Sequence, residues 1–240
     1  LLTGEVDVVH GRTPAPNFVV ILTDDMAWSG TSVQMDPTRP DSKSDYYQTP
    51  NLESLAADGM VFSRAYASGP ICSPTRAALQ TGKSPAQLRV TDVRNGGKFA
   101  NSRFRQFYNG KPLMAPIPRV TFVHPVERTL PQMLKSASPE YSASLFGKED
   151  WRPNPRKKGY DFYLHNLPVN RDQEDPGDIF AISRQAMQFM ENQVSADRPF
   201  FTLLAHYAPK LPFPYVATQE SIDFFEGVPP GERHDNLEYA

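Results

Sequence analysis

The single cysteine of the chain begins the sequence Cys72-Ser73-Pro74-Thr75-Arg76. A proline two residues after the cysteine predicts a helix that begins near Pro74 and has Cys72 at its mouth. The free N–H groups and the positive dipole end of a helix N-terminus favour an anion, such as sulfate, beside the cysteine. One helical turn brings the guanidinium of Arg76 toward the same place, where its planar donors suit an oxyanion. The alternative is a buried, unreactive cysteine.

A second candidate site is the pair Asp24-Asp25, which closely follows the apolar run 18–22. That run is continuous and rich in β-branched residues, as expected for a strand buried on both faces of a parallel sheet. Carboxylates just beyond the carboxyl end of such a strand stand where open α/β sheets bind ligands. They suit a hard divalent cation, Ca²⁺ or Mg²⁺, which prefers oxygen ligands. A solvated turn or a helix cap is the other interpretation.

Further predicted elements must position these residues. Apolar runs predict further strands at 60–62, 142–146 and 199–205. Helical spacing, Thr49-Pro50 and the breaks at Gly59 and Gly82 predict helices at 50–58, 74–81, around 130–134 and at 176–194. Residues 83–128 are rich in Gly, Pro, Asn and Arg and are expected to hold little regular structure. Alternating strands and helices indicate an α/β fold with a largely parallel central sheet and helices on both faces.

The bulk composition of the 240 residues excludes some classes of protein. A formal net charge of −2 gives no electrostatic footprint for nucleic acid or an anionic membrane. We find no run of 18 apolar residues, so no membrane span is expected. One cysteine excludes an intrachain disulfide, and 24 prolines predict long surface connections. The remaining histidines, at positions 10, 124, 165 and 234, fall in loop-like sequence and are expected at the surface.

From residue 16 onward the sequence resembles the sulfatase family. The segment 16–25 is similar to the family's opening strand, and 49–52 with 55–62 is similar to its next segment. The family's Cys-x-Pro-x-Arg motif is present at Cys72, Pro74 and Arg76, followed by Leu79-Gln80-Thr81-Gly82. The order, spacing and length of these matches make the resemblance specific. It implies the alkaline-phosphatase-like fold, in agreement with the α/β pattern.

The resemblance implies a mechanism and its cofactors. In sulfatases a separate formylglycine-generating enzyme oxidises the cysteine at the position of Cys72 to formylglycine. One hydroxyl of the hydrated aldehyde attacks the sulfur of the ester, and the second then expels sulfate, which splits one substitution into two steps. The resemblance also assigns Asp24, Asp25 and the residue at 72 as ligands of a Ca²⁺ ion, with Mg²⁺ as an alternative. Arg76 would hold the formylglycine in place.

Two later segments match the family only in part. Leu145-Phe146-Gly147-Lys148 resembles the segment in which a lysine contacts the substrate sulfate, but Asp150 stands where the family commonly has histidine. After the run 198–209, the family's Pro-His pair is replaced by Pro209-Lys210, and Lys210 could still bind sulfate as a point charge. His206 could compensate for the missing histidine, or could be an ordinary residue near a strand end.

The resemblance covers about 16–240, after an N-terminal arm at 1–15. It implies the N-terminal portion of a sulfatase catalytic domain, without the C-terminal half, which in the family carries two more metal ligands, and without the small C-terminal domain. We therefore expect a sulfuric ester hydrolase acting on a sulfated small molecule or glycan, in the periplasm or secreted. Two alternatives stay open: a phosphonate or phosphate monoester hydrolase of the same superfamily, and a non-catalytic glycan-binding relative.

Overall fold

The computed structural model describes residues 15–90, 107–108, 111–112, 123–150, 154–165, 174–209 and 217–234. Lys210 lies outside the described residues, as does the predicted arm apart from its last residue. Within these ranges, no helix combines the length and the apolar character needed to cross a membrane.

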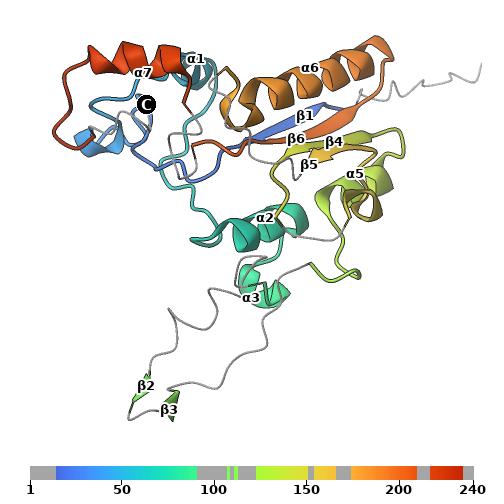
Figure 1. The fold of residues 1–240 in the computed structure, drawn as a ribbon. Coiled ribbons are helices and arrows are strands. Elements are labelled where there is room, and N and C mark those ends of the chain that lie inside the picture. Colours follow the sequence, from blue (N-terminus) through green and yellow to red (C-terminus); the bar gives the residue numbers. More distant parts are fainter. Residues whose placement is uncertain are drawn as a thin grey trace, which may run out of the picture.

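A four-stranded parallel sheet lies at the centre of the molecule (Figure 1). Its strands are β1 (Phe18–Leu22), β4 (Ser142–Gly147), β5 (Phe162–His165) and β6 (Phe200–Ala205), in the order β1-β6-β4-β5. In the register, Ala205 pairs with both Leu22 and Gly147. The carboxyl ends of β1, β6 and β4 therefore meet at one edge of the sheet, where α/β proteins bind ligands.

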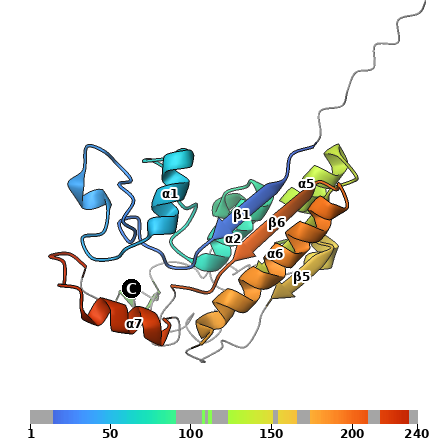
Figure 2. The ribbon, with the colours of Figure 1, turned by 90° about the horizontal axis from the view of Figure 1, so that it is seen from above.

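Helices cover both faces of the sheet. The helix α6 (Ile179–Ser195) packs on one face, and α2 (Cys72–Thr81) and α5 (Leu130–Ala137) lie on the other, as Figures 1 and 2 show. Neighbouring strand residues alternate between the two cores, since Leu145 and Leu203 belong to one hydrophobic cluster and Phe146 and Leu204 to the other. The predicted α/β class, with helices on both faces, is confirmed.

Shorter elements complete the described fold. They comprise helices α1 (Pro50–Asp58), α3 (Pro85–Leu88) and α7 (Gln219–Glu226), 3₁₀ turns η1 (Pro40–Ser42), η2 (Pro155–Lys158) and η3 (Pro176–Asp178), and the hairpin strands β2 (Phe107–Tyr108) and β3 (Lys111–Pro112). Several begin with proline just after a capping residue; at α5, Thr129 and Gln132 form a capping box. Proline is favoured in the first turn because backbone N–H groups there have no intrahelical acceptor, so the lack of an N–H in proline removes no hydrogen bond.

Three sequence predictions are wrong in detail. The strand expected at 60–62 is absent, and Met60 and Phe62 are exposed. The strand at 18–22 forms, but it lies at the edge of the described sheet with Ile21 exposed, rather than buried on both faces. The helix expected to begin near Pro74 begins at Cys72, because Ile71 takes the extended N-cap conformation.

Candidate active site

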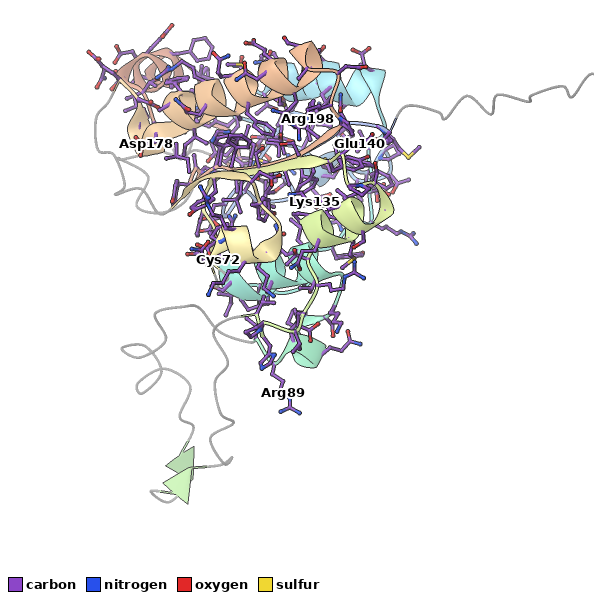
Figure 3. The ribbon with its side chains drawn as sticks, turned by 90° about the vertical axis from the view of Figure 1, so that its right-hand side faces the viewer. Cys72, Arg89, Lys135, Glu140, Asp178 and Arg198 are labelled. Atoms are coloured by element: carbon purple, nitrogen blue, oxygen red, sulfur yellow. The ribbon has the colours of Figure 1, made fainter. Side chains whose placement is uncertain are left out.

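The start of α2 places Cys72 beneath the carboxyl edge of the sheet (Figure 3). Thr75 Oγ1 donates to the carbonyl oxygen of Gly69 at 2.7 Å and so fixes the chain entering the helix. Gly82 ends the helix in the left-handed conformation, at φ 68°, which a glycine adopts without steric cost. Cys72 is half-buried at the first helical turn. The predicted position of Cys72 at a helix N-terminus is confirmed.

Arg76 links this helix to two strand ends. Its side chain is buried and donates from Nη2 to Asp24 Oδ1 at 3.2 Å and from Nη1 to the carbonyl oxygen of Lys148 at 3.0 Å. The Nε of Arg76 is buried and has no hydrogen-bond partner within the described residues. The sequence predicted that Arg76 faces the site of Cys72, and the structure adds the carboxylate that holds it there.

Gly147 determines where Lys148 lies. At φ 99°, Gly147 has a backbone conformation that other residues rarely adopt, and a Cβ atom there would lie 2.0 Å from the carbonyl oxygen of Ala205. The close approach lets the N–H of Lys148 donate to that same oxygen at 2.7 Å. Lys148 Nζ, which is buried, then lies 2.5 Å from Asp24 Oδ2 and 3.1 Å from Asp150 Oδ2.

The described residues thus bring together a charge cluster of five side chains, namely those of Asp24, Cys72, Arg76, Lys148 and Asp150. The Cys72 thiol and the Asp150 carboxylate are near enough for each to shift the pKa of the other. Burial raises the pKa of the Cys72 thiol, and the two carboxylates raise it further against the opposing effect of Lys148. Cys72 is therefore a neutral thiol, a poor nucleophile in its unmodified form.

Opposite charges keep Lys148 and Asp150 ionised. Burial would lower the pKa of Lys148, but Asp150 and Asp24 raise it above its ordinary value. Burial would raise the pKa of Asp150, but Lys148 and the thiol of Cys72 hold it below its ordinary value. Asp150 replaces the histidine expected from the resemblance, and as a carboxylate it accepts hydrogen bonds where a histidine could donate one.

The predicted metal ligands Asp24 and Asp25 point into different surroundings. Asp24 is buried with both oxygens on cations, whereas Asp25 is exposed and has a left-handed backbone at φ 63°. No group of three or more His, Cys, Asp or Glu side chains in the described ranges is arranged to hold a metal ion. Since Ca²⁺ takes six or more oxygens, these residues alone do not form a complete calcium site.

His206 lies at the same edge of the sheet, directly after β6. Its N–H donates to the carbonyl oxygen of Leu22 at 3.0 Å, and the N–H of Asp24 donates to Ala208 at 2.9 Å. Burial lowers the pKa of His206, so the imidazole is neutral near pH 7, and its Nδ1 has no partner within the described residues. No described contact joins the His206 side chain to the charge cluster, so its catalytic role stays a prediction.

One polar network was not foreseen from the sequence. His234 Nδ1 lies 2.9 Å from Asp45 Oδ1, and His234 Nε2 lies 3.4 Å from Ser29 Oγ. The N–H of Arg233 donates to the same carboxylate at 3.0 Å. His234, expected at the surface, is partly buried, because it ties the segment after α7 to the loop after β1. Only a fold brings residues so distant in sequence into contact.

Lys158 belongs to a short basic run with Arg152, Arg156 and Lys157. Such a run usually forms a solvated face of the protein. Lys158 is fully buried instead, and its ammonium group donates to the carbonyl oxygens of His124, Pro125 and Glu127. Arg156 and Lys157 are exposed as expected, and Arg152 lies outside the described residues.

Comparison with known proteins agrees with this arrangement. The Sulfatase family model matches residues 16–230. N-acetylgalactosamine-6-sulfatase of Mus musculus is 32% identical over 84% of this chain and 41% of its own length, and that of Homo sapiens is 30% identical over 88% and 43%. Choline-sulfatase of Rhizobium meliloti (strain 1021) is 25% identical over 89% and 42%. The chain thus spans about two fifths of the length of these curated relatives.

Solved structures show the same fold. Ps i-CgsB in complex with k-i-k-neocarrahexaose has a TM-score of 0.64 at 20% identity and covers 93% of this chain and 51% of its own. A structure in complex with its substrate D-glucosamine-2-N,6-O-disulfate has a TM-score of 0.62 at 20% identity and covers 90% and 39%. With the family model matched over most of the chain, and with Cys72, Arg76 and Lys148 at one edge of the sheet, this chain belongs to the sulfatase family.

Proposed function

We propose that the protein hydrolyses a sulfate monoester, with residue 72 as the nucleophile after a formylglycine-generating enzyme has oxidised Cys72. The observation that carries this proposal is the charge cluster, in which Arg76 and Lys148 flank Cys72 at the start of a helix. Formylglycine would supply a hydrated aldehyde, whose hydroxyls attack sulfur and later release sulfate. Neutral Cys72 itself could not do so efficiently.

The chain's own residues bind and orient the ester in this proposal. The ammonium group of Lys148 supplies positive charge for sulfate oxygens, and the start of α2 adds its N–H groups. Arg76 keeps the start of α2 against the ends of β1 and β4, because its guanidinium bonds to residues on both. Lys210 and His206 remain candidates to bind sulfate or to donate a proton to the leaving group.

Calcium is part of the proposal, with Mg²⁺ as the alternative. Carboxylates at Asp24 and Asp25, beside residue 72, are the ligand type that such hard cations prefer. They form only part of a coordination shell, and a bound ion would compete with Lys148 for Asp24. Calorimetric titration of the full-length protein with Ca²⁺ tests this assignment: unchanged affinity in Asp24→Asn and Asp25→Asn would contradict it.

The substrate is proposed to be a sulfated glycan or a sulfated small molecule. The names of the relatives support this class, since two act on N-acetylgalactosamine-6-sulfate groups by name and one solved structure holds a disulfated glucosamine. A periplasmic or secreted location is proposed with it.

A non-catalytic glycan-binding role is the second candidate, and the specific observation in its favour is Asp150. Its carboxylate stands where the family commonly has histidine, and it forms an ion pair with Lys148 beside residue 72. Turnover of 4-nitrophenyl sulfate by the full-length protein, produced with a formylglycine-generating enzyme, separates the two roles. We expect turnover that Cys72→Ala abolishes; formylglycine without turnover of any sulfate ester would favour the binding role.

A further inference from the structure

Asp150 is the member of the charge cluster to which the proposed mechanism gives no task. Its Oδ2 lies 3.1 Å from Lys148 Nζ, and its carboxylate is near enough to the Cys72 thiol to raise the pKa of that thiol. Its backbone is left-handed, at φ 50°. Strained conformations of this kind are concentrated at functional sites, where the surrounding structure holds them.

The backbone that leads to Asp150 is held by hydrogen bonds at Lys148. The N–H of Lys148 donates to Ala205, and the carbonyl oxygen of Lys148 accepts from buried Arg76. Glu149, which lies between Lys148 and Asp150 in the sequence, is buried. The Asp150 carboxylate is therefore held beside residue 72 by the same contacts that position Lys148, so its charge is a constant feature of the site.

The charges in the cluster cancel. Asp24 and Asp150 contribute two negative formal charges, and Arg76 and Lys148 contribute two positive ones, while Cys72 is neutral. The two carboxylates differ in access: the side chain of Asp24 is 4% exposed, whereas that of Asp150 is 25% exposed. An anion that approaches residue 72 therefore meets the negative charge of Asp150 more directly than that of Asp24.

That charge acts differently on two kinds of ester. A sulfate monoester carries one negative charge at neutral pH, whereas a phosphate monoester, whose second pKa is about 6, carries nearly two. Coulomb repulsion is proportional to the ligand's charge, so Asp150 opposes the phosphate ester about twice as strongly. The effect is largest where solvent is partly excluded, as it is here.

We propose that Asp150 is a specificity-determining residue, which favours monoanionic sulfate esters over dianionic phosphate esters through its negative charge beside residue 72. This inference rests on the proposed function, because it concerns the substrate class of the same site. It assigns a task to the carboxylate that replaces the expected histidine. The replacement removes a possible hydrogen-bond donor and makes the site disfavour the second negative charge of a phosphate ester.

The test compares 4-nitrophenyl sulfate with 4-nitrophenyl phosphate at pH 8, using the full-length protein carrying formylglycine and the variants Asp150→Asn and Asp150→Glu. We expect Asp150→Asn to raise the ratio of kcat/KM for phosphate to that for sulfate by at least about tenfold. Asp150→Glu keeps the charge and should change the ratio much less. Asp41→Asn, which removes an exposed carboxylate paired with Arg39, is the matched control and should leave the ratio unchanged.

A merely structural role for Asp150 would lower both rates together, and an unchanged ratio in Asp150→Asn overturns the inference while sulfate turnover continues to support the proposed function. Absence of sulfate turnover in the wild type would instead contradict the proposed function. If Asp150→Asn is inactive, calorimetric affinities for 4-nitrophenyl sulfate and 4-nitrophenyl phosphate at pH 8, measured in a Cys72→Ala background with and without Asp150→Asn, decide the matter. The inference then requires that the variant gain phosphate affinity relative to sulfate, and equal changes overturn it.

Discussion

The ammonium group of Lys148 lies 2.5 Å from the carboxylate of Asp24, although 124 residues separate them in sequence. Lys148 follows β4 and Asp24 follows β1, and both strands are neighbours of β6. The ion pair therefore joins two strand ends across the strand between them. Arg76 adds a third connection, from α2, so that the helix bearing Cys72 and the edge of the sheet form one unit.

Removing Lys148 should be costly for stability. In Lys148→Met, buried Asp24 keeps only Arg76 as a charged partner, and breaking a buried ion pair costs about 3–5 kcal/mol. The free energy of unfolding from urea titration measures this loss. Lys135→Met is the control, because its pair with Asp161 is partly exposed and such pairs are worth below about 1 kcal/mol. Similar losses in both variants would show that the buried Lys148–Asp24 pair contributes no more to stability than a partly exposed pair.

Gly147→Ala should destabilise the protein by about 3 kcal/mol or more, since the new Cβ would collide with the carbonyl oxygen of Ala205 and occupy a left-handed backbone. Gly82→Ala provides a matched comparison. It introduces the same strain, at about 1–2 kcal/mol, but meets no atom within 4 Å. Thermal or urea unfolding of both variants tests this order, and a larger loss at Gly82 would show that the strand contact is not as described.

Stability should depend on Asp45 in acid. Burial would raise the pKa of Asp45, but His234, the N–H of Arg233 and the Arg233 charge hold it far below its ordinary value. A carboxyl with a lowered pKa in the folded state stabilises the fold above its unfolded pKa, near 3.9, and loses that contribution as the pH falls further. The difference in unfolding free energy between wild type and Asp45→Asn should therefore have its largest value near pH 6 and become smaller below pH 4.

His234 provides the control for that prediction. In a His234→Ala background one of the donors to Asp45 is gone, so the pH dependence of the Asp45→Asn difference should become smaller. A difference that stays constant from pH 6 to pH 3 in the wild-type background would contradict the role given to this carboxylate.

Local sequence signals predicted much of the fold. Apolar runs located β1, β4 and β6, and proline with glycine marked α1 and α2, because these patterns depend on the local chain alone. Exposure was less predictable: an apolar run cannot tell a central strand from an edge strand, so β1 was placed wrongly. Several short elements were missed, among them α3, β5 and α7, since four to eight residues give weak periodicity.

The candidate site was predictable in its residue types and only partly in its contacts. Cys72, Arg76 and Lys148 were identified from motifs, and the structure brings them together. The pair Asp24-Asp25 predicts a metal site but does not reveal that the Asp24 carboxylate contacts Arg76 and Lys148. These two partners lie far from Asp24 in the sequence and are brought to it only by the fold. The proximity of Cys72 to Asp150 likewise depends on α2 meeting the end of β4, where Arg76 donates to the carbonyl oxygen of Lys148.

We propose above that residue 72, once oxidised, is the nucleophile that attacks a sulfate ester. Mass spectrometry of the peptide containing residue 72 tests it most directly, with the full-length protein produced in a host that contains a formylglycine-generating enzyme. We expect formylglycine at position 72. Unmodified cysteine there, in a host that converts a known sulfatase produced in parallel, would contradict it.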